Sequence, residues 1–256
     1  MQLFLEDGSY ILMNEGIDCS IPITASAKNP TAWYVAAPSI EVVRENGWVG
    51  SVNEGGSVNF RNIHFNPHGH GTHTECLGHI TPTVYSVNGL VNKLFYQAHV
   101  VSVVPALIEH ADGQTDTVIT AESFGNALDD VQAEAILFRT LPNEVAKLSQ
   151  QYSATNPTYC STDILPILEN MGVRHLLIDT PSVDRESDGG VLAFHHAFWG
   201  VPNDLQHDKT ITELIFVPNE VKDGPYLLNL QTAAFENDAT PSRPVIYPIH
   251  RNEEEQ

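Results

Sequence analysis

The chain has 256 residues, of which 42% are hydrophobic, so it can bury a substantial core in one large domain or two small ones. Its formal net charge of -20 argues against binding to a nucleic-acid backbone, which requires clustered lysine and arginine. It has no apolar run of about 18 residues, and its start, MQLFLEDGSY, lacks the basic and apolar regions of a secretory signal, so we predict neither a membrane span nor export.

Stretches rich in β-branched and aromatic residues predict strands. In chain order they are residues 33–37, 57–65, 99–104, 135–140, 175–179 and 212–217. Two helices have recognisable N-caps: Thr120 begins one that runs to about Val131, and Ser161 or Thr162 begins one that ends at Gly172. The alternation of helices and strands suggests an α/β fold, and no linker-like segment divides the chain, so we expect a single domain over residues 1–256.

The three cysteines, Cys19, Cys76 and Cys160, are widely spaced and form neither a CxxC pair nor a disulfide framework. A reducing compartment suits such thiols, and we therefore expect a cytoplasmic protein.

The segment FNPHGHGTHTECLGHI, residues 65–80, contains four histidines and one glutamate. Imidazoles and carboxylates are ligands that suit zinc, manganese or iron. On a strand, residues i and i+2 share a face, so His73 and Glu75 would point the same way. The earlier histidines, His68 and His70, have the opposite parity. A bulge at the neighbouring glycines would bring His68 round beside the first pair.

Within that segment, GTHTECLGH resembles the signature of the metal-dependent cyclase family, His-x-Gly-Thr-His-x-Asp-x-Pro-x-His. Four further segments are similar to the family's motifs in the same order: DCSIPI (residues 18–23), GVRHLLIDTPSVD (172–184), HHAF (195–198) and ATPSRPV (239–245). The resemblance thus spans nearly the whole chain. It implies an α/β fold, a single domain with a mixed, barrel-like β-sheet flanked by helices.

The resemblance also implies a set of metal ligands. His68, His73 and Glu75 would hold a first ion. Glu75 would bridge to a second ion, which His195 and Glu213 would also hold. The expected metal is Zn²⁺ or Mn²⁺, with one or two ions per chain.

The chain departs from the family pattern at two of these positions. The first family histidine lies four residues before the second, where this chain has Gly69, whereas the family's Pro-His pair matches residues 67–68. His68 is therefore favoured over His70 as the first ligand, and both remain open. The bridging acid is Glu75 in place of aspartate, and the glutamate side chain is about one bond longer.

The activity that the resemblance implies is hydrolysis of a carboxylic amide, an arylformamide or a cyclic amide, by metal-activated water. His79 falls on the family histidine that handles protons, and it would pass one to the leaving nitrogen. The resemblance therefore implies an arylformamidase-like enzyme of tryptophan catabolism that acts on a small molecule and forms a homodimer. A non-catalytic member that binds metal or ligand is the alternative, and a cupin-like oxygenase with two histidines and one carboxylate is a third hypothesis.

Residues beside these motifs have structural interpretations. On a strand Cys76 would face away from the ligands, as a packed thiol, and His196 would face away from His195. We expect Asp184 to brace its loop, with a hydrogen bond to a metal ligand as the alternative. Trp33 is either a core residue or an aromatic wall for a flat substrate.

Overall fold

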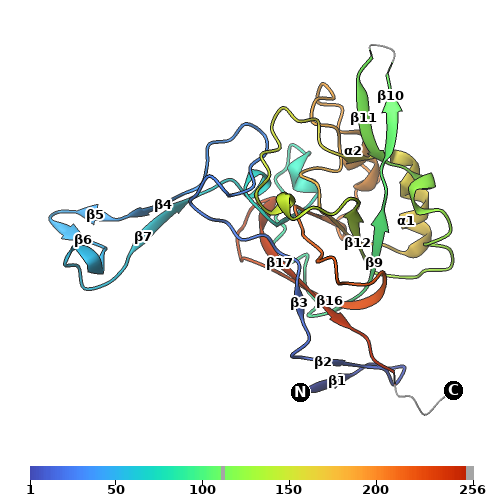
Figure 1. The fold of residues 1–256 in the computed structure, drawn as a ribbon, viewed down its shortest axis with the longest axis horizontal. Helices are drawn as coiled ribbons and strands as arrows, with labels where there is room; N and C mark the ends of the chain where they lie inside the picture. The colour runs from blue at the N-terminus through green and yellow to red at the C-terminus, as the bar shows by residue number, and fades with distance from the viewer. Residues whose placement is uncertain (111–112, 252–256) are drawn as a thin grey trace.

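The computed structural model describes residues 1–110 and 113–251, and a closed mixed sheet of seven strands lies at its centre (Figure 1). The strand order is β16-β9-β12-β14-β15-β8-β17, and pairing of β17 with β16 closes the sheet. The short strand β3 pairs with Val245 and Ile246 of β17, further along that strand than the residues that pair with β8. The strands are β3 (Ile17–Asp18), β8 (His73–Glu75), β9 (Tyr96–Val103), β12 (Ala135–Thr140), β14 (His175–Ile178), β15 (Thr210–Glu213), β16 (Gly224–Thr232) and β17 (Ala239–Pro248). The fold class expected from the sequence, a mixed, barrel-like sheet flanked by helices, is confirmed.

Alternate side chains point to opposite sides of each strand, and in this sheet both sets pack in buried clusters, so both faces are buried. In β12, Ala135 and Leu137 pack within one cluster with residues from β9, β16 and β17. Ile136 and Phe138 pack in a second cluster that includes residues of the helices α1 (Leu165–Met171) and α2 (Ala193–Phe198). The helices therefore cover one outer face of the sheet.

Four of the predicted strands coincide with or overlap strands of the sheet. Residues 135–140 are β12, and residues 99–104, 175–179 and 212–217 overlap β9, β14 and β15. The predicted helix up to Gly172 is also present, as the 3-10 turn η6 (Thr162–Ile164) followed by α1. Gly172 ends it in the left-handed conformation, with φ 81°.

Two predicted elements are wrong. Residues 33–37 form no strand, because Trp33 and Tyr34 both have left-handed backbone angles, with φ of 59° and 57°. Thr120 caps only the short 3-10 turn η4 (Ala121–Phe124), because Gly125 follows with φ 51° and breaks the helical path. Of the predicted strand over 57–65, only β7 (Arg61–His64) forms.

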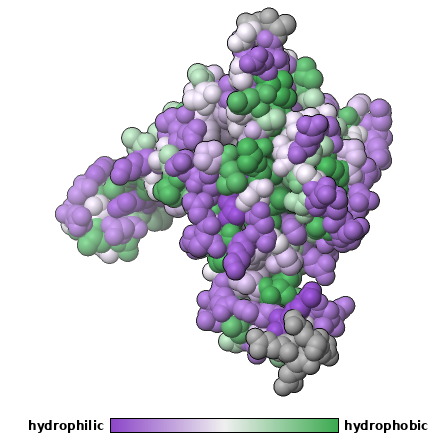
Figure 2. Space-filling model, turned by 45° about the vertical axis from the view of Figure 1, so that its right-hand side comes forward, coloured by the Kyte–Doolittle hydropathy of each residue, from purple (hydrophilic) through white to green (hydrophobic). Residues whose placement is uncertain are grey.

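β7 belongs to an arm that projects from the body of the molecule (Figure 1). It pairs with β4 (Ser39–Val42), and the tip carries β5 (Arg44–Glu45), β6 (Trp48–Val49) and the turn η1 (Val52–Glu54). Figure 2 shows hydrophobic residues among hydrophilic ones on this arm and over the visible face of the body.

The remaining elements are short. They are β1 (Gln2–Phe4), β2 (Tyr10–Leu12), β10 (Ala106–Glu109), β11 (Thr115–Ile119), β13 (Tyr159–Cys160), η2 (Pro67–Gly69), η3 (Leu77–His79) and η5 (Val145–Ser149). Among the described residues, no helix has the length and apolar character needed to cross a membrane. The assignment of residues 1–256 to a single domain stays a prediction.

Candidate metal centre

The strand β8 places two of the predicted ligands on the sheet face that α2 covers. It lies between β15 and β17, and in its register with β15 the residue opposite His73 is Glu213. Nε2 of His73 lies 3.4 Å from Oε2 of Glu213. His73, Glu75 and Glu213 are all buried. The predicted i, i+2 arrangement of His73 and Glu75 is present, and the neighbouring strand adds the second carboxylate.

His68 reaches the same place from a turn, and the predicted bulge in a strand is wrong. β8 begins only at His73, and His68 lies in η2, where the side chain of Asn66 accepts the His68 backbone N–H at 2.9 Å. Gly71 then adopts φ 143°, which side-chain-bearing residues rarely adopt. This path brings Nδ1 of His68 to 2.9 Å from Oε2 of Glu75.

His70, the other candidate for the first ligand, points elsewhere. Its Nδ1 accepts the backbone N–H of Asn66 at 2.8 Å, and its Nε2 donates to the carbonyl oxygen of Ala36 at 2.8 Å. Burial lowers the pKa of His70, which agrees with a neutral ring in this role. Both ring nitrogens are therefore occupied, and the geometry favours His68.

His195 approaches the cluster from α2. Its Nε2 lies 3.0 Å from Oε1 of Glu75, and its Nδ1 donates to Oδ2 of Asp184 at 2.6 Å. Asp184 also accepts the backbone N–H groups of Phe194 and His195, at 2.8 and 3.1 Å. It therefore orients the imidazole, as one of the two roles expected for this residue from the sequence. Cys76 is a buried thiol that donates to the carbonyl oxygen of Tyr85 at 3.3 Å, as predicted.

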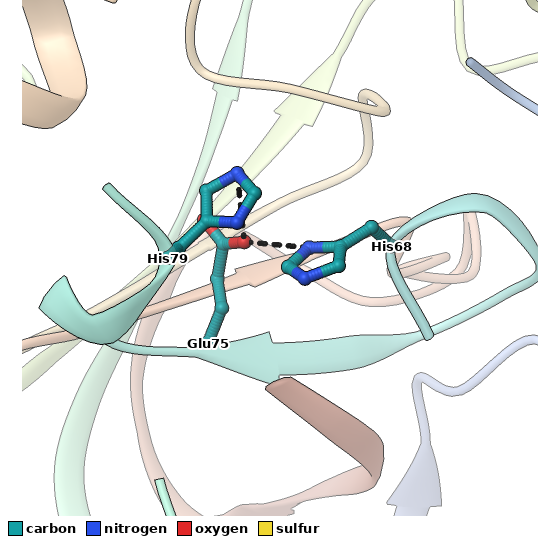
Figure 3. A group of neighbouring side chains, drawn as sticks. All are labelled: His68, Glu75 and His79. Atoms are coloured by element: carbon teal, nitrogen blue, oxygen red, sulfur yellow. Dashed lines mark ion pairs between the residues drawn. The ribbon is translucent and has the colours of Figure 1, made fainter. Parts of the chain in front are cut away.

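The turn η3 brings His79 over the same carboxylate. His68, Glu75 and His79 come from a turn, a strand and a second turn and point toward one another (Figure 3). Nε2 of His79 lies 3.9 Å from Oε2 of Glu75, and Nδ1 lies 3.3 Å from Oδ2 of Asp238. That same oxygen lies 3.0 Å from Nε2 of His68.

Asp238 is the site residue that the sequence motifs missed. It directly precedes ATPSRPV, the segment that resembles a family motif, but it lies outside the quoted pattern. Its only signal in the sequence is an acidic residue at the start of a segment predicted to belong to the site.

The cluster joins four imidazoles with four carboxylates, and its charges are strongly coupled. Burial opposes a charged His68, but the carboxylates of Asp238 and Glu75 raise its pKa to about 10. Burial likewise opposes a charged His195, whereas Asp184 and Glu75 raise its pKa to about 10. Burial together with the charge of Glu75 raises the pKa of Glu213. These carboxylates thus stabilise positive charge inside the buried cluster.

Two buried atoms that could bind a metal form no hydrogen bond among the described residues: Nε2 of His73 and Oε2 of Glu75. Each contacts another titratable member of the cluster, Oε2 of Glu213 at 3.4 Å and Nδ1 of His68 at 2.9 Å. A buried polar atom without a hydrogen bond is costly, and here two of them lie in one cluster. The nitrogen and carboxylate atoms fall into two groups that share Glu75, one with His68 and His79 and one with His73 and Glu213, with all atoms of a group within 4.8 Å of one another. Such a donor set suits zinc or manganese, so these residues fit one cation or two that share a carboxylate.

A pocket of about 470 Å³ opens beside the cluster. His68, His79, His195 and Glu213 line it, and Trp33 forms part of the wall. Trp33 is half-buried and also packs against the small core cluster of Ala32, Tyr152 and Leu214, so it has a core contact, while its role as a wall for a flat substrate stays a prediction.

The chain matches the family model described as putative cyclase over residues 17–185, which is more than half of its length. It is 35% identical over 117 residues to kynurenine formamidase of Bacillus cytotoxicus, covering 45% of this chain and 50% of the relative. It is 38% identical over 88 residues to kynurenine formamidase of Bacillus anthracis, covering 34% and 38%. The alignments span about half or less of the length of these curated relatives.

Solved structures share the fold. A structure described as a novel cyclase superposes with a TM-score of 0.66 at 14% identity, covering 93% of this chain and 90% of the other. An isatin hydrolase bound to a product analogue, thioisatinate, superposes with a TM-score of 0.64 at 12% identity, covering 91% and 92%. A potential metal-dependent hydrolase with cyclase activity gives a TM-score of 0.62 at 17% identity, covering 93% and 98%. Since the family model covers residues 17–185 and the whole fold agrees with it, this chain belongs to the putative cyclase family.

Proposed function

We propose that this chain is a metal-dependent hydrolase that uses water to cleave a carboxylic amide, either an arylformamide or a cyclic amide. The observation that carries the proposal is a pair of buried atoms that form no hydrogen bond among the described residues, Nε2 of His73 and Oε2 of Glu75, inside a cluster that lines a pocket of about 470 Å³. The names of similar proteins, kynurenine formamidase and isatin hydrolase, support an amide as the substrate class.

The proposed ligands are those expected from the family motif, His68, His73, Glu75, His195 and Glu213, and they would hold one ion or two that share Glu75. The motif assigns His68 and His73 to one ion and His195 and Glu213 to the other, whereas the donor atoms lie together as His68, Glu75 and His79 and as His73, Glu75 and Glu213. A bound Zn²⁺ or Mn²⁺ ion would supply Lewis acidity, lowering the pKa of a water molecule toward about 7 and polarising a carbonyl group.

The residues of the chain supply orientation and proton transfer. Hydrolysis adds the oxygen of water to the carbonyl carbon, breaks the C–N bond and delivers one proton to the leaving nitrogen. We assign that proton transfer to His79, and its 31% exposed side chain, which lines the pocket, supports this role. Asp184 holds the ring of His195, and the backbone N–H of Val183 donates to Oε1 of Glu213 at 3.1 Å, so both side chains are oriented before substrate arrives.

The test is a panel of arylformamides and cyclic amides, assayed with the metal-loaded protein and with His79→Ala. We expect His79→Ala to abolish hydrolysis while metal content is unchanged. His64→Ala, which removes an exposed histidine on the arm, is the matched control and should behave as wild type. Undiminished turnover by His79→Ala would refute the proton route. Metal binding with no turnover of any amide would favour the alternative, a non-catalytic metal-binding or ligand-binding member of the family.

The homodimer, the cytoplasmic location and a place in tryptophan catabolism stay predictions from the sequence. Size-exclusion chromatography with light scattering tests the first of them directly.

A further inference from the structure

One carboxylate oxygen at the rim of the cluster contacts two histidines at once. Oδ2 of Asp238 lies 3.0 Å from Nε2 of His68 and 3.3 Å from Nδ1 of His79. The two imidazole rings stack with their centroids 4.2 Å apart and an angle of 28° between their planes. The Asp238 side chain is 17% exposed, so its charge is largely withdrawn from water.

The backbone holds Asp238 in a defined position relative to β8. Its carbonyl oxygen accepts the backbone N–H of Cys76 at 3.1 Å, directly after Glu75. The next residue, Ala239, begins β17 in register with Glu75. The preceding residue, Asn237, accepts the backbone N–H of Val87 at 2.8 Å. The backbone on both sides of Asp238 is therefore held by hydrogen bonds, so its side chain does not extend from a free loop.

An ionised carboxylate only accepts hydrogen bonds, and one of its oxygens can accept two. The nitrogen of each ring that faces Asp238 must therefore carry a hydrogen. In a neutral imidazole the other nitrogen then holds the lone pair. The nitrogen facing Asp238 is Nε2 in His68 but Nδ1 in His79, so the same oxygen selects opposite tautomers in the two rings.

We propose that Asp238 is a positioning residue that sets His68 as the Nε2–H tautomer and His79 as the Nδ1–H tautomer. A cation beside Glu75 would replace the second proton of His68; because Asp238 keeps the hydrogen on Nε2, the lone pair is then on Nδ1, the atom 2.9 Å from Glu75. The lone pair of His79 is on Nε2, which also faces Glu75 and is free to take up and release a proton. What these lone pairs do, and the neutral state of His68, rest on the proposed function, whereas the hydrogens that face Asp238 follow from the contacts.

A carboxylate that only neutralised charge or braced the turn would leave the His79 tautomer free to take the Nε2–H form that imidazole prefers in water. The decisive measurement is therefore the tautomer. Long-range ¹H–¹⁵N correlation spectra of protein with ¹⁵N-labelled imidazoles report it, at a pH where His79 is neutral and with its signals assigned from His79→Gln. The variants are Asp238→Ala, Asp238→Asn and the control Glu236→Gln, which removes an exposed acid two residues away that bonds to Asn88.

We expect wild type and Glu236→Gln to show His79 as Nδ1–H and Asp238→Ala to show mainly Nε2–H. Titration of zinc against a competing chelator should show an affinity loss of about 10- to 100-fold for Asp238→Ala, the usual effect of removing the partner of a ligating histidine. Glu236→Gln should change neither property. If Asp238→Ala fails to fold, Asp238→Asn, which keeps the shape but loses the charge, should still lose about tenfold in zinc affinity.

An Nε2–H form of His79 in the wild-type protein overturns the proposal. So do an unchanged tautomer and unchanged zinc affinity in the Asp238 variants. A wild-type protein that binds no zinc refutes the metal dependence of the proposed function, but the His79 tautomer in the metal-free protein still decides the role of Asp238. A protein that binds zinc and hydrolyses no amide refutes only the proposed reaction.

Discussion

Replacing Gly71 with alanine should strain the backbone and disturb the metal centre together. Gly71 has φ 143°, and an added Cβ would lie 3.0 Å from the carbonyl oxygen of Ile21 and 3.3 Å from Cγ1 of Ile23. A side chain in such a backbone conformation costs about 1–3 kcal/mol. The backbone atoms of Ile21 cannot move aside easily, so Gly71 itself must shift.

That shift reaches a proposed metal ligand directly, because the carbonyl oxygen of Gly71 accepts Nδ1–H of His73 at 3.0 Å. This bond leaves Nε2 of His73 facing Glu213. Loss of the partner of a ligating histidine usually lowers metal affinity about 10- to 100-fold, and we expect Gly71→Ala to fall in that range.

Gly47→Ala is the matched control. Gly47 lies on the arm with φ 80° and has no atom within 4 Å of an added Cβ, so its substitution carries backbone strain without touching the site. Urea unfolding should show both variants destabilised, by about 1–2 kcal/mol for Gly47→Ala and about 1–3 kcal/mol for Gly71→Ala. Chelator competition should show weaker zinc binding only in Gly71→Ala. Equal zinc affinity in the two variants would refute the link from the backbone at Gly71 to His73.

Two further predictions use residues outside the ligand set. Asp184→Asn should lower zinc affinity about 10- to 100-fold by chelator competition, because the charge that orients His195 is lost, and an unchanged affinity would contradict that role. Burial opposes ionisation of Asp116, but hydrogen bonds from Arg185, Asn156 and Tyr159 hold its pKa well below the usual value. Its stabilisation is therefore present above about pH 4 and lost as the pH falls below it. Urea unfolding across that range should show a shallower acid loss of stability in Asp116→Asn than in wild type, and parallel curves would contradict the assignment.

The sequence predicts the strands that are buried on both faces better than the others. AILFRT at residues 135–140 begins with four apolar residues and ends with Arg139 and the β-branched Thr140, and it forms β12 with the same bounds. The long pair β16 and β17 was not predicted, because both segments contain proline and polar residues, and their pairing joins residues that are distant in the chain. WYVAA has strand-like composition, but Trp33 and Tyr34 both adopt left-handed backbone angles, and Trp33 lines the pocket.

For the site, the spacing of residues within one segment predicts which side chains lie together, whereas contacts between segments distant in the chain are not predicted by it. The i, i+2 rule placed His73 and Glu75 together, and the family motif pointed to His195, which the structure brings to 3.0 Å from Glu75. The route of His68 was predicted as a bulge, because spacing alone does not distinguish a bulge from the turn η2 before a short strand. Asp238 depends on where β17 begins against β8, and this register is set by long-range pairing.

The most direct test of the account is elemental analysis of the protein purified without added metal or chelator. The cluster of imidazoles and carboxylates, with two buried atoms that form no hydrogen bond among the described residues, predicts about one to two equivalents of zinc or manganese per chain. A preparation that contains no metal, and takes up neither zinc nor manganese on titration, would contradict the central claim that these residues form a metal centre.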